Sequence, residues 1–166
     1  VLPGVGAFGA CMENLGKRGL ADAIKGHIRD GKRYLGICLG MQILFESSEE
    51  APGIPGLHII RGTVPRFTGS MKIPHMGWNS INIMKGSPMF RGIGSGDFFY
   101  FVHSFYCAPS DPEVVATTTE YGDPFVSSIE TGKVFACQFH PEKSQTVGLK
   151  LLQNFLDIAE RSKSVV

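Results

Sequence analysis

The chain has 166 residues, 43% of them hydrophobic and 19% charged, proportions that fit one globular domain over residues 1–166 and exclude a disordered chain. Its formal net charge of +1 provides no broad positive surface, so we expect no nucleic-acid partner. No apolar run approaches the roughly 20 residues that span a bilayer, so we expect no membrane partner.

The chain opens on a glycine-rich stretch, "LPGVGAFG", that allows two interpretations. Gly4, Gly6 and Gly9 match the G-x-G-x-x-G pattern that cradles a dinucleotide pyrophosphate, but barely any strand precedes them. A glycine-rich turn can equally present backbone N–H groups to an oxyanion. We favour the oxyanion role, because a candidate nucleophile follows later in the chain. The start lacks a methionine, which we interpret as a cut end rather than a processed signal peptide.

Strands and helices then alternate. Apolar residues recur at helical spacing between Leu20 and Ile28, and Asp30-Gly31 ends that helix. The stretch "YLGI" is typical of a short buried strand, and "LGMQILFESSEE" returns to a helical pattern that includes Met41 and Phe45. Alternation with short connections predicts a parallel sheet.

A cysteine lies where this strand passes into the next helix. The sequence "GICLG" places Cys38 between Gly36 and Gly40, which is the nucleophile-elbow pattern with cysteine as the nucleophile. The glycines relieve crowding in the sharp turn, and the start of the helix would favour the thiolate. The alternative is a buried structural cysteine in a glycine-rich turn.

The middle of the chain consists of short β-rich runs separated by Gly, Pro, Asp and Ser. Such close spacing predicts antiparallel pairing, because a parallel crossover needs a dozen or more residues. The stretch "IPHMGWNS" holds Trp78, which is either a core residue or an interface anchor. His103 and Ser104 in "YFVHSFY" either line a pocket or are ordinary strand residues.

A candidate partner for the cysteine appears in "QFHPEKS". In extended backbone, residues two apart project to the same side, so Glu142 can hold one ring nitrogen of His140 while the other faces Cys38. This gives a nucleophile, a base and an orienting carboxylate, the logic of a catalytic triad. The alternative is a surface histidine and glutamate ahead of a helix. That last helix is predicted from "TVGLKLLQNFLDIAERSK", with a buried side formed by Val147, Leu151, Leu152, Phe155, Leu156 and Ala159.

The spacing of cysteines and histidines indicates neither a disulfide framework nor a metal site. The four cysteines form no C-x-x-C pair, so we expect a reducing, cytoplasmic location. The histidines lack metal-ligand spacing, so we assign no metal.

Five segments together resemble a known family: "LPGVGAFG", "GICLGMQ", "PHMGWN", "FVHSFY" and "QFHPEKS". They are similar, in the same order, to segments of the class I glutamine amidotransferases. "GICLG" and "HPE" indicate only that class, whereas "LPGVGAFG" and "PHMGWN" point to the glutaminase subunits of imidazole glycerol phosphate synthase. The resemblance implies an α/β fold, a flavodoxin-like three-layer sandwich with a mostly parallel central sheet and an antiparallel β-rich insertion.

The resemblance also implies an activity and a partner. Glutamine would be hydrolysed to glutamate and ammonia, and the ammonia would pass through a tunnel in a (β/α)₈-barrel cyclase subunit, the other half of a heterodimer. There it would help to form imidazole glycerol phosphate and an aminoimidazole carboxamide ribotide in histidine biosynthesis. No cofactor is expected.

Site residues follow from the resemblance position by position. The implied catalytic residues are Cys38, His140 and Glu142. The implied oxyanion donors are the backbone N–H groups of Leu39 and Val5. The implied glutamine-pocket residues are Gly4, Gly6, Gln42, His103 and Ser104. The implied cyclase-facing residues are Pro74, His75, Met76, Gly77, Trp78 and Asn79.

One departure from the family concerns the first elements of its fold. Family members begin with a strand, a helix and a second strand upstream of "LPGVGAFG", so we expect this chain to lack the first strand-helix-strand unit and to expose a sheet edge.

Three alternative functions stay open. One alternative is another cysteine hydrolase of this fold, similar to γ-glutamyl peptidases. A second is an inactive partner-binding fragment, and a third is a dinucleotide-binding protein.

Overall fold

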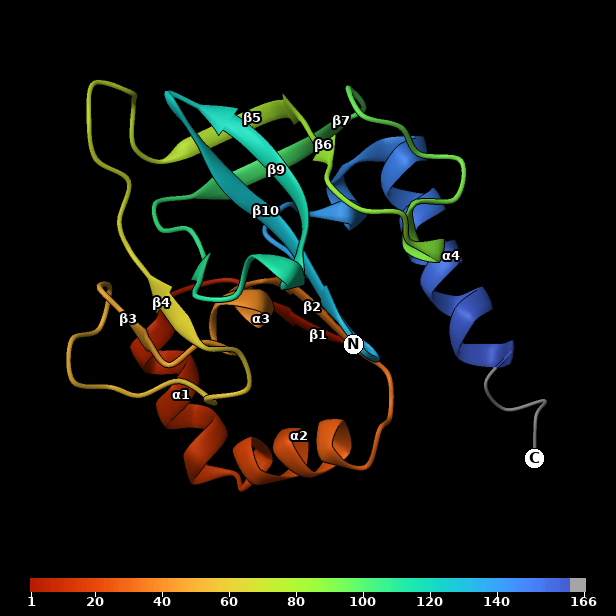
Figure 1. Ribbon diagram of the computed structural model, residues 1–166. Coiled ribbons are helices and arrows are strands. Elements are labelled where there is room, and N and C mark those ends of the chain that lie inside the picture. Colours follow the sequence, from red (N-terminus) through yellow and green to blue (C-terminus); the bar gives the residue numbers. More distant parts are fainter. Residues whose placement is uncertain (162–166) are drawn as a thin grey trace.

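A six-stranded sheet forms the centre of the protein in the computed structural model, which describes residues 1–161 (Figure 1). Its strands, in spatial order, are β1 (Leu2–Gly4), β2 (Tyr34–Cys38), β11 (Val134–Cys137), β10 (Asp123–Thr131), β9 (Val115–Tyr121) and β6 (Asn82–Ile83). The edge strand β1 is short and pairs with β2 alone in the described part of the chain.

The sheet is mixed, which corrects the expectation of a mostly parallel one. Strands β1, β2 and β11 pair in parallel, whereas β11, β10, β9 and β6 pair in antiparallel fashion. The cause is the length of the connections. Only tight turns at Gly122 and Gly132, both at positive φ, join β9 to β10 and β10 to β11, and such turns can connect antiparallel strands only.

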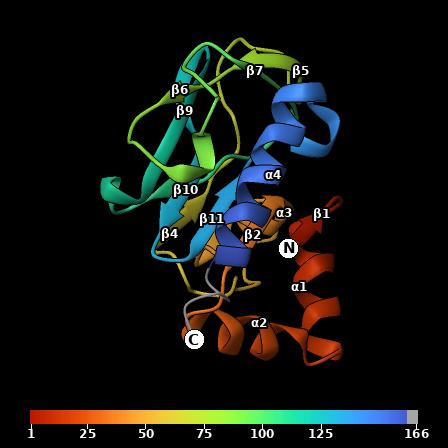
Figure 2. The ribbon, with the colours of Figure 1, turned by 90° about the vertical axis from the view of Figure 1, so that its right-hand side faces the viewer.

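Helices cover both faces of the sheet, so the α/β class and the three-layer arrangement are confirmed (Figures 1 and 2). Helices α1 (Phe8–Lys17) and α2 (Leu20–Arg29) lie on one face, and α4 (Gln145–Arg161) lies on the other. Successive side chains of β2 alternate between the two cores. Leu35 packs in the cluster that contains Phe155 of α4, and Tyr34 packs in the cluster that contains Leu15 of α1.

Two smaller sheets complete the β structure. The antiparallel pair of β5 (His75–Ser80) and β7 (Phe98–His103) lies above the central sheet in Figure 1 and forms the expected β-rich insertion. The other sheet joins β3 (Ser47–Ser48), β4 (Gly62–Val64) and β8 (Ala108–Pro109). Three 3₁₀ turns connect these elements: η1 (Pro88–Phe90), η2 (Pro112–Val114) and η3 (Pro141–Lys143).

The helix expected after Cys38 is much shorter than its sequence pattern predicts. Helix α3 spans only Leu39–Gln42, and the chain then runs into β3. The next residues, 43–45, are fully buried, so no amphipathic face distinguishes them. Their carbonyl groups accept from Leu57, Ile59 and His58 instead of continuing the helix. Tertiary backbone hydrogen bonds therefore outcompete the local helical pattern.

The two other predicted helices form, with one difference in α4. Helix α2 ends at Arg29, before Asp30-Gly31, as expected. In α4, Leu151 and Phe155 are buried as expected, but Leu156 is 50% exposed and does not belong to the buried side. The end of the predicted helix, residues 162–163, lies outside the described residues.

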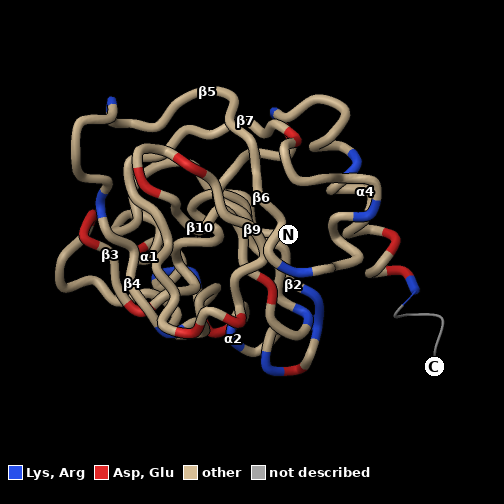
Figure 3. The backbone as a smooth tube through the Cα atoms, turned by 45° about the horizontal axis from the view of Figure 1, so that its top comes forward, with Lys and Arg blue, Asp and Glu red and all other residues tan. Residues whose placement is uncertain are grey.

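Charges are distributed without a dominant sign. Figure 3 shows acidic and basic residues interspersed around the molecule, while β5 and β7 carry neither kind. Across residues 1–161, none of the helices is both long and apolar enough to cross a bilayer.

Gly40 of α3 packs closely against the backbone of β1, and it provides a test of the packing. A methyl group on Gly40 would overlap the carbonyl oxygen of Leu2, so Gly40→Ala must push the edge strand away. We expect a loss of about 2–4 kcal/mol in the free energy of unfolding. The control is Gly16→Ala in α1, where an added methyl group meets nothing and should stabilise the fold by about 0.5–1 kcal/mol. Urea unfolding of both variants measures the difference, and equal stabilities would contradict this account.

Candidate active site

Cys38 lies on a strained turn between β2 and α3. Its backbone angles are φ 53° and ψ −107°, a region that residues with a side chain rarely adopt. The flanking glycines explain how the chain tolerates this turn. A methyl group on Gly36 would overlap the carbonyl group of Gly40, and one on Gly40 would overlap Leu2. The elbow predicted from "GICLG" is therefore present, and the cysteine side chain is 8% exposed.

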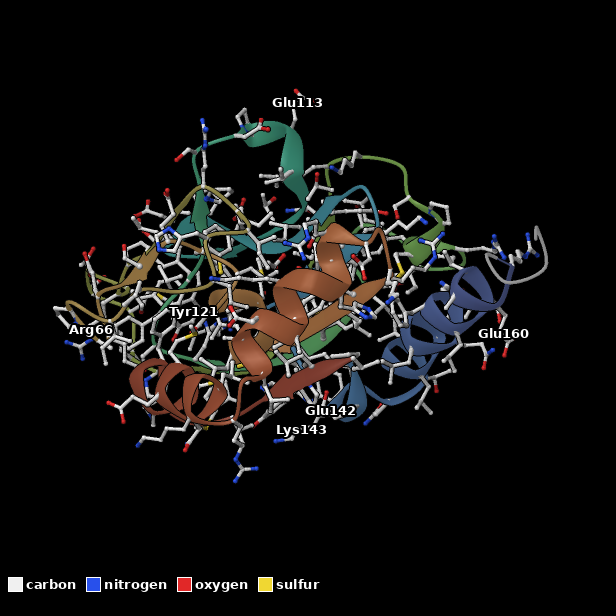
Figure 4. All side chains as sticks on the ribbon, turned by 90° about the horizontal axis from the view of Figure 1, so that it is seen from below. Arg66, Glu113, Tyr121, Glu142, Lys143 and Glu160 are labelled. Atoms are coloured by element: carbon white, nitrogen blue, oxygen red, sulfur yellow. The ribbon has the colours of Figure 1, made fainter. Side chains whose placement is uncertain are left out.

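His140 follows β11, the strand that pairs with β2, and is held by a carboxylate. Its Nδ1 lies 2.7 Å from Oε1 of Glu142, an oxygen that accepts hydrogen bonds, so Nδ1 carries the proton and Nε2 has the free lone pair. The ring is 1% exposed, and Nε2 has no hydrogen-bond partner among the described residues. Glu142 itself is half-exposed and appears at the outer edge of the molecule beside Lys143 in Figure 4. This geometry suits a general base.

A cavity of about 420 Å³ brings most of the predicted site residues together. Cys38 and His140 both line it, as do Val5, Gly6, Leu39, Gln42, Pro74, His103 and Ser104. Gly4 pairs in register with Cys38, so the Val5-Gly6 turn leaves β1 directly beside the nucleophile. The volume is in the range of small-molecule sites.

The electrostatic environment of Cys38 differs from the expectation. Burial raises the pKa of its thiol to about 11, although the Leu39 backbone N–H and the Gln138 side chain act in the opposite direction. The Leu39 N–H at the start of α3 favours the thiolate as expected, but the effect of burial is larger, so the thiol is protonated at rest. The thiol must therefore lose its proton during the reaction, which requires a base such as His140 nearby.

Sequence analysis missed two residues of this site. Glu50 lines the cavity, and its Oε2 accepts a hydrogen bond from Phe8 N at 2.8 Å, at the start of α1. Gln138 is fully buried, and its Nε2 donates to Cys38 Sγ at 3.5 Å. The alternation of an extended strand could have found Gln138, because it precedes His140 by two residues. No comparable signal in "ESSEE" distinguishes Glu50 from its neighbours.

The two buried histidines on β5 and β7 form a directed hydrogen-bond chain. His103 Nδ1 donates to the Phe105 carbonyl at 2.8 Å, so its Nε2 must accept, and it accepts from His75 Nδ1 at 2.9 Å. His75 Nε2 then accepts from Asn79 Nδ2 at 3.2 Å. Both rings are thus neutral, and burial lowers their pKa values to about 4 for His75 and about 3 for His103. Because both nitrogens of His103 are taken, it contributes only ring surface to the cavity.

The two faces of the β5–β7 ribbon differ. His75 is 3% exposed and Asn79 bonds inward, whereas Met76 and Trp78 are 62% and 45% exposed. Phe98, 56% exposed, pairs opposite Ser80 on the same outward face. We call Met76, Trp78 and Phe98 the outer strip. Of the predicted cyclase-facing segment, only Met76 and Trp78 present large apolar side chains to solvent.

Comparison with known proteins connects this geometry to a family. The family model of class-I glutamine amidotransferases matches residues 1–159. A chain from Syntrophotalea carbinolica, called imidazole glycerol phosphate synthase subunit HisH, is 50% identical over 165 residues, covering 95% of this chain and 80% of its own. The HisH chain from Methanocaldococcus jannaschii, which has the same name, is 52% identical, with coverages of 95% and 79%.

Solved structures show the same fold at lower identity. The crystal structure of a glutamine amidotransferase matches with a TM-score of 0.71 at 22% identity, covering 95% of this chain and 77% of the other. A glutamine amidotransferase from Thermotoga maritima matches with a TM-score of 0.64 at 17% identity, with coverages of 97% and 63%.

The buried histidines predict how stability depends on pH. In the unfolded chain, a histidine takes up a proton near pH 6.5, whereas His75 and His103 resist protonation down to about pH 4 and about pH 3. Between these values the unfolded state binds more protons, so the free energy of unfolding falls as the pH falls. We expect His103→Gln to make the unfolding free energy less dependent on pH. The slope should decrease by at most about 1.4 kcal/mol per pH unit, which corresponds to one proton. Urea unfolding between pH 7 and pH 4 measures both slopes, and identical slopes would contradict the assignment.

Proposed function

Because this chain belongs to the class-I glutamine amidotransferases and, within them, to the HisH subunits of imidazole glycerol phosphate synthase, we propose that Cys38, His140 and Glu142 are its catalytic triad. The protein hydrolyses glutamine to glutamate and ammonia for histidine biosynthesis. The observation that supports the triad is a strained cysteine that shares a cavity with a histidine whose Nδ1 is held by Glu142.

In the first half of the reaction, the Cys38 thiol gives its proton to His140 Nε2, and the sulfur attacks the carboxamide carbon of glutamine. The new S–C bond converts the carbonyl oxygen into an oxyanion. Collapse of this intermediate breaks the C–N bond, and ammonia leaves with the proton from His140. A γ-glutamyl thioester on Cys38 remains.

In the second half, His140 takes a proton from water as the water oxygen attacks the thioester carbon. The S–C bond then breaks, glutamate is released, and the sulfur regains a proton from His140. Glu142 stabilises the imidazolium that forms in both halves, because its carboxylate bonds Nδ1 at 2.7 Å. The net change is glutamine plus water to glutamate plus ammonia.

Backbone N–H groups beside the sulfur would stabilise the oxyanion. The Leu39 N–H follows the nucleophile directly, and its hydrogen bond already favours the Cys38 thiolate. The second donor is the Val5 N–H in the turn after β1. Gly6 has a φ of 107° in this turn, a backbone conformation that favours glycine. Because glycine has no side chain that could clash, the turn can change its backbone conformation at this residue without steric strain. Partner binding can shift the turn toward its productive state.

The cavity walls supply the glutamine pocket, with Gly6 and Ser104 among the lining residues and Gly4 at the end of β1 just before the turn. Both hydrogens of the Gln42 amide are used, one by the Phe105 carbonyl at 3.2 Å and one by Gln138 Oε1 at 3.0 Å. Gln42 therefore offers glutamine an acceptor, its Oε1, rather than a donor. His103 offers an aromatic wall.

The partner that we propose is the cyclase, the (β/α)₈ barrel that receives the ammonia. Its docking surface on this chain is the outer strip with the segment from Pro74 to Asn79. The strip is apolar, uncharged and exposed, and Trp and Met are enriched at protein interfaces. Pro74 also lines the catalytic cavity, so the segment connects the docking surface with the site of ammonia release. We place the complex in the cytoplasm.

The nucleophile is tested by substitution. We expect Cys38→Ser to lower ammonia release from glutamine at least about 1,000-fold in the presence of the cyclase, because a serine in this site is a poor nucleophile. The control is Cys137→Ser, whose sulfur is buried one strand away and points to the Phe139 carbonyl. Ammonia release that survives in Cys38→Ser would remove the assignment, and loss in both variants would point to unfolding.

The docking surface is tested by binding. Trp78→Ala should weaken association with the cyclase at least about tenfold, since exposed tryptophans commonly dominate interfaces. The matched control is Leu156→Ala, an apolar residue of α4 that is 50% exposed outside the strip. A binding titration measures affinity, and mass spectrometry measures alkylation of Cys38, which should be unchanged in both variants. Equal affinities for Trp78→Ala and the wild type would contradict the docking surface.

A further inference from the structure

We propose that Gln138 is a further catalytic residue, whose side-chain N–H holds the Cys38 sulfur and stabilises it whenever it carries negative charge. The proposal rests on the proposed glutaminase function for its consequences in turnover. Its structural basis is independent of that function, because it concerns the contacts of the thiol itself.

Strand register brings the two residues together. Strands β2 and β11 are parallel, and Ile37 pairs with Cys137, so the next residue along each strand is Cys38 on one and Gln138 on the other. The Gln138 backbone N–H is bound to the Ser127 carbonyl at 2.8 Å, and the side chain is 0% exposed. Its position beside the nucleophile is therefore set by the sheet, and not by a flexible loop.

The orientation of the Gln138 amide follows from its neighbours. The Phe105 carbonyl can only accept, so the Gln42 atom that faces it at 3.2 Å is Nε2. That same nitrogen faces Gln138 at 3.0 Å, so the facing atom of Gln138 must be the acceptor, Oε1. The other end of the Gln138 amide is then Nε2, which donates to Cys38 Sγ at 3.5 Å. One backbone carbonyl thus fixes the polarity of both amides.

A donor at this point matters because the sulfur is buried. Burial disfavours the thiolate, and the half-exposed Glu142 carboxylate disfavours it further. The Gln138 N–H and the Leu39 N–H act against both effects. A hydrogen bond to a charged acceptor is stronger than one to a neutral acceptor, so Gln138 binds the thiolate more strongly than the thiol or the thioester.

This preference would assist both halves of the reaction. In the first, the S–H bond breaks toward His140 and the sulfur becomes negative as it attacks. In the second, the S–C bond breaks and the sulfur leaves with the electron pair. Gln138 makes and breaks no covalent bond in either half, so its effect should appear in kcat more than in KM.

The test compares thiol reactivity in two variants of the full chain. Gln138→Met removes the donor and keeps an unbranched buried side chain, and Gln138→Glu keeps the shape but places a carboxyl group beside the sulfur. Alkylation of Cys38 by iodoacetamide is followed between pH 6 and pH 10 by mass spectrometry of its peptide. Cys11, half-buried in α1, is the internal control in the same samples.

We expect Cys38 to react about tenfold more slowly at pH 8 in Gln138→Met, and more slowly still in Gln138→Glu, with the curve of rate against pH displaced to higher pH across the measured range. Cys11 should be unchanged. A folded variant with the wild-type Cys38 profile would overturn the proposal. If Gln138→Met does not fold, Gln138→Glu alone decides the question by the same criterion.

Turnover provides the second measurement. With the cyclase present, kcat of Gln138→Met should fall about tenfold while KM stays within about twofold. A raised KM at unchanged kcat would mean that Gln138 only shapes the pocket, and would overturn the proposal. A wild-type protein that alkylates as expected but releases no ammonia would refute the glutaminase function, and the alkylation comparison would still decide the role of Gln138.

Discussion

The parallel pairing of β2 with β11 is the constraint on which the site depends. It aligns the carboxyl ends of strands that lie about a hundred residues apart in the chain, so that Cys38 leaves one strand where Gln138 and His140 leave the other. On the other side, β1 pairs with β2 so that Gly4 lies opposite Cys38. The proposed nucleophile, base and oxyanion turn thus meet at the carboxyl ends of the strands, which is where open α/β sheets bind their ligands.

This arrangement combines strain and burial at one residue. Cys38 has a positive φ, a buried sulfur and a thiol pKa of about 11, each unfavourable on its own. Hydrogen bonds to the surrounding backbone hold the site in this conformation. Tyr34 Oη donates to the Gly40 carbonyl at 2.7 Å, and His140 N donates to the Tyr100 carbonyl at 2.9 Å. The site is therefore held by the two strands β2 and β7 and their neighbours, with the reactive group protonated at rest.

Sequence predicted the local arrangement of the site residues better than the details of the fold. The "GICLG" and "QFHPEKS" motifs carry local information, glycines for a tight turn and alternation for a histidine and its carboxylate, and the structure has both features. The prediction that the helix continues after Gln42 was wrong. The carbonyl groups of the fully buried Ile43 and Phe45 accept hydrogen bonds from backbone N–H groups farther along the chain, which no local pattern reveals. The mostly parallel sheet implied by the resemblance was wrong, whereas the antiparallel pairing predicted from the close spacing of the runs that form β9, β10 and β11 is confirmed. The contact of Gln138 with Cys38 and the pairing of the two histidines depend on register between separate strands, which one sequence does not display.

The β5–β7 ribbon has a consequence for how the chain can vary in length. Neighbouring residues of β5 belong to opposite faces, with buried His75 packed against the aromatic core and exposed Met76 facing outward. Because side chains alternate along a strand, an insertion or deletion of one residue inside β5 would exchange the faces. The histidine chain would turn to solvent and the apolar strip would turn into the core. The exposed residues 69–72 ahead of Pro74 carry no such alternation, so we expect a change in chain length to disturb the fold less there than inside β5.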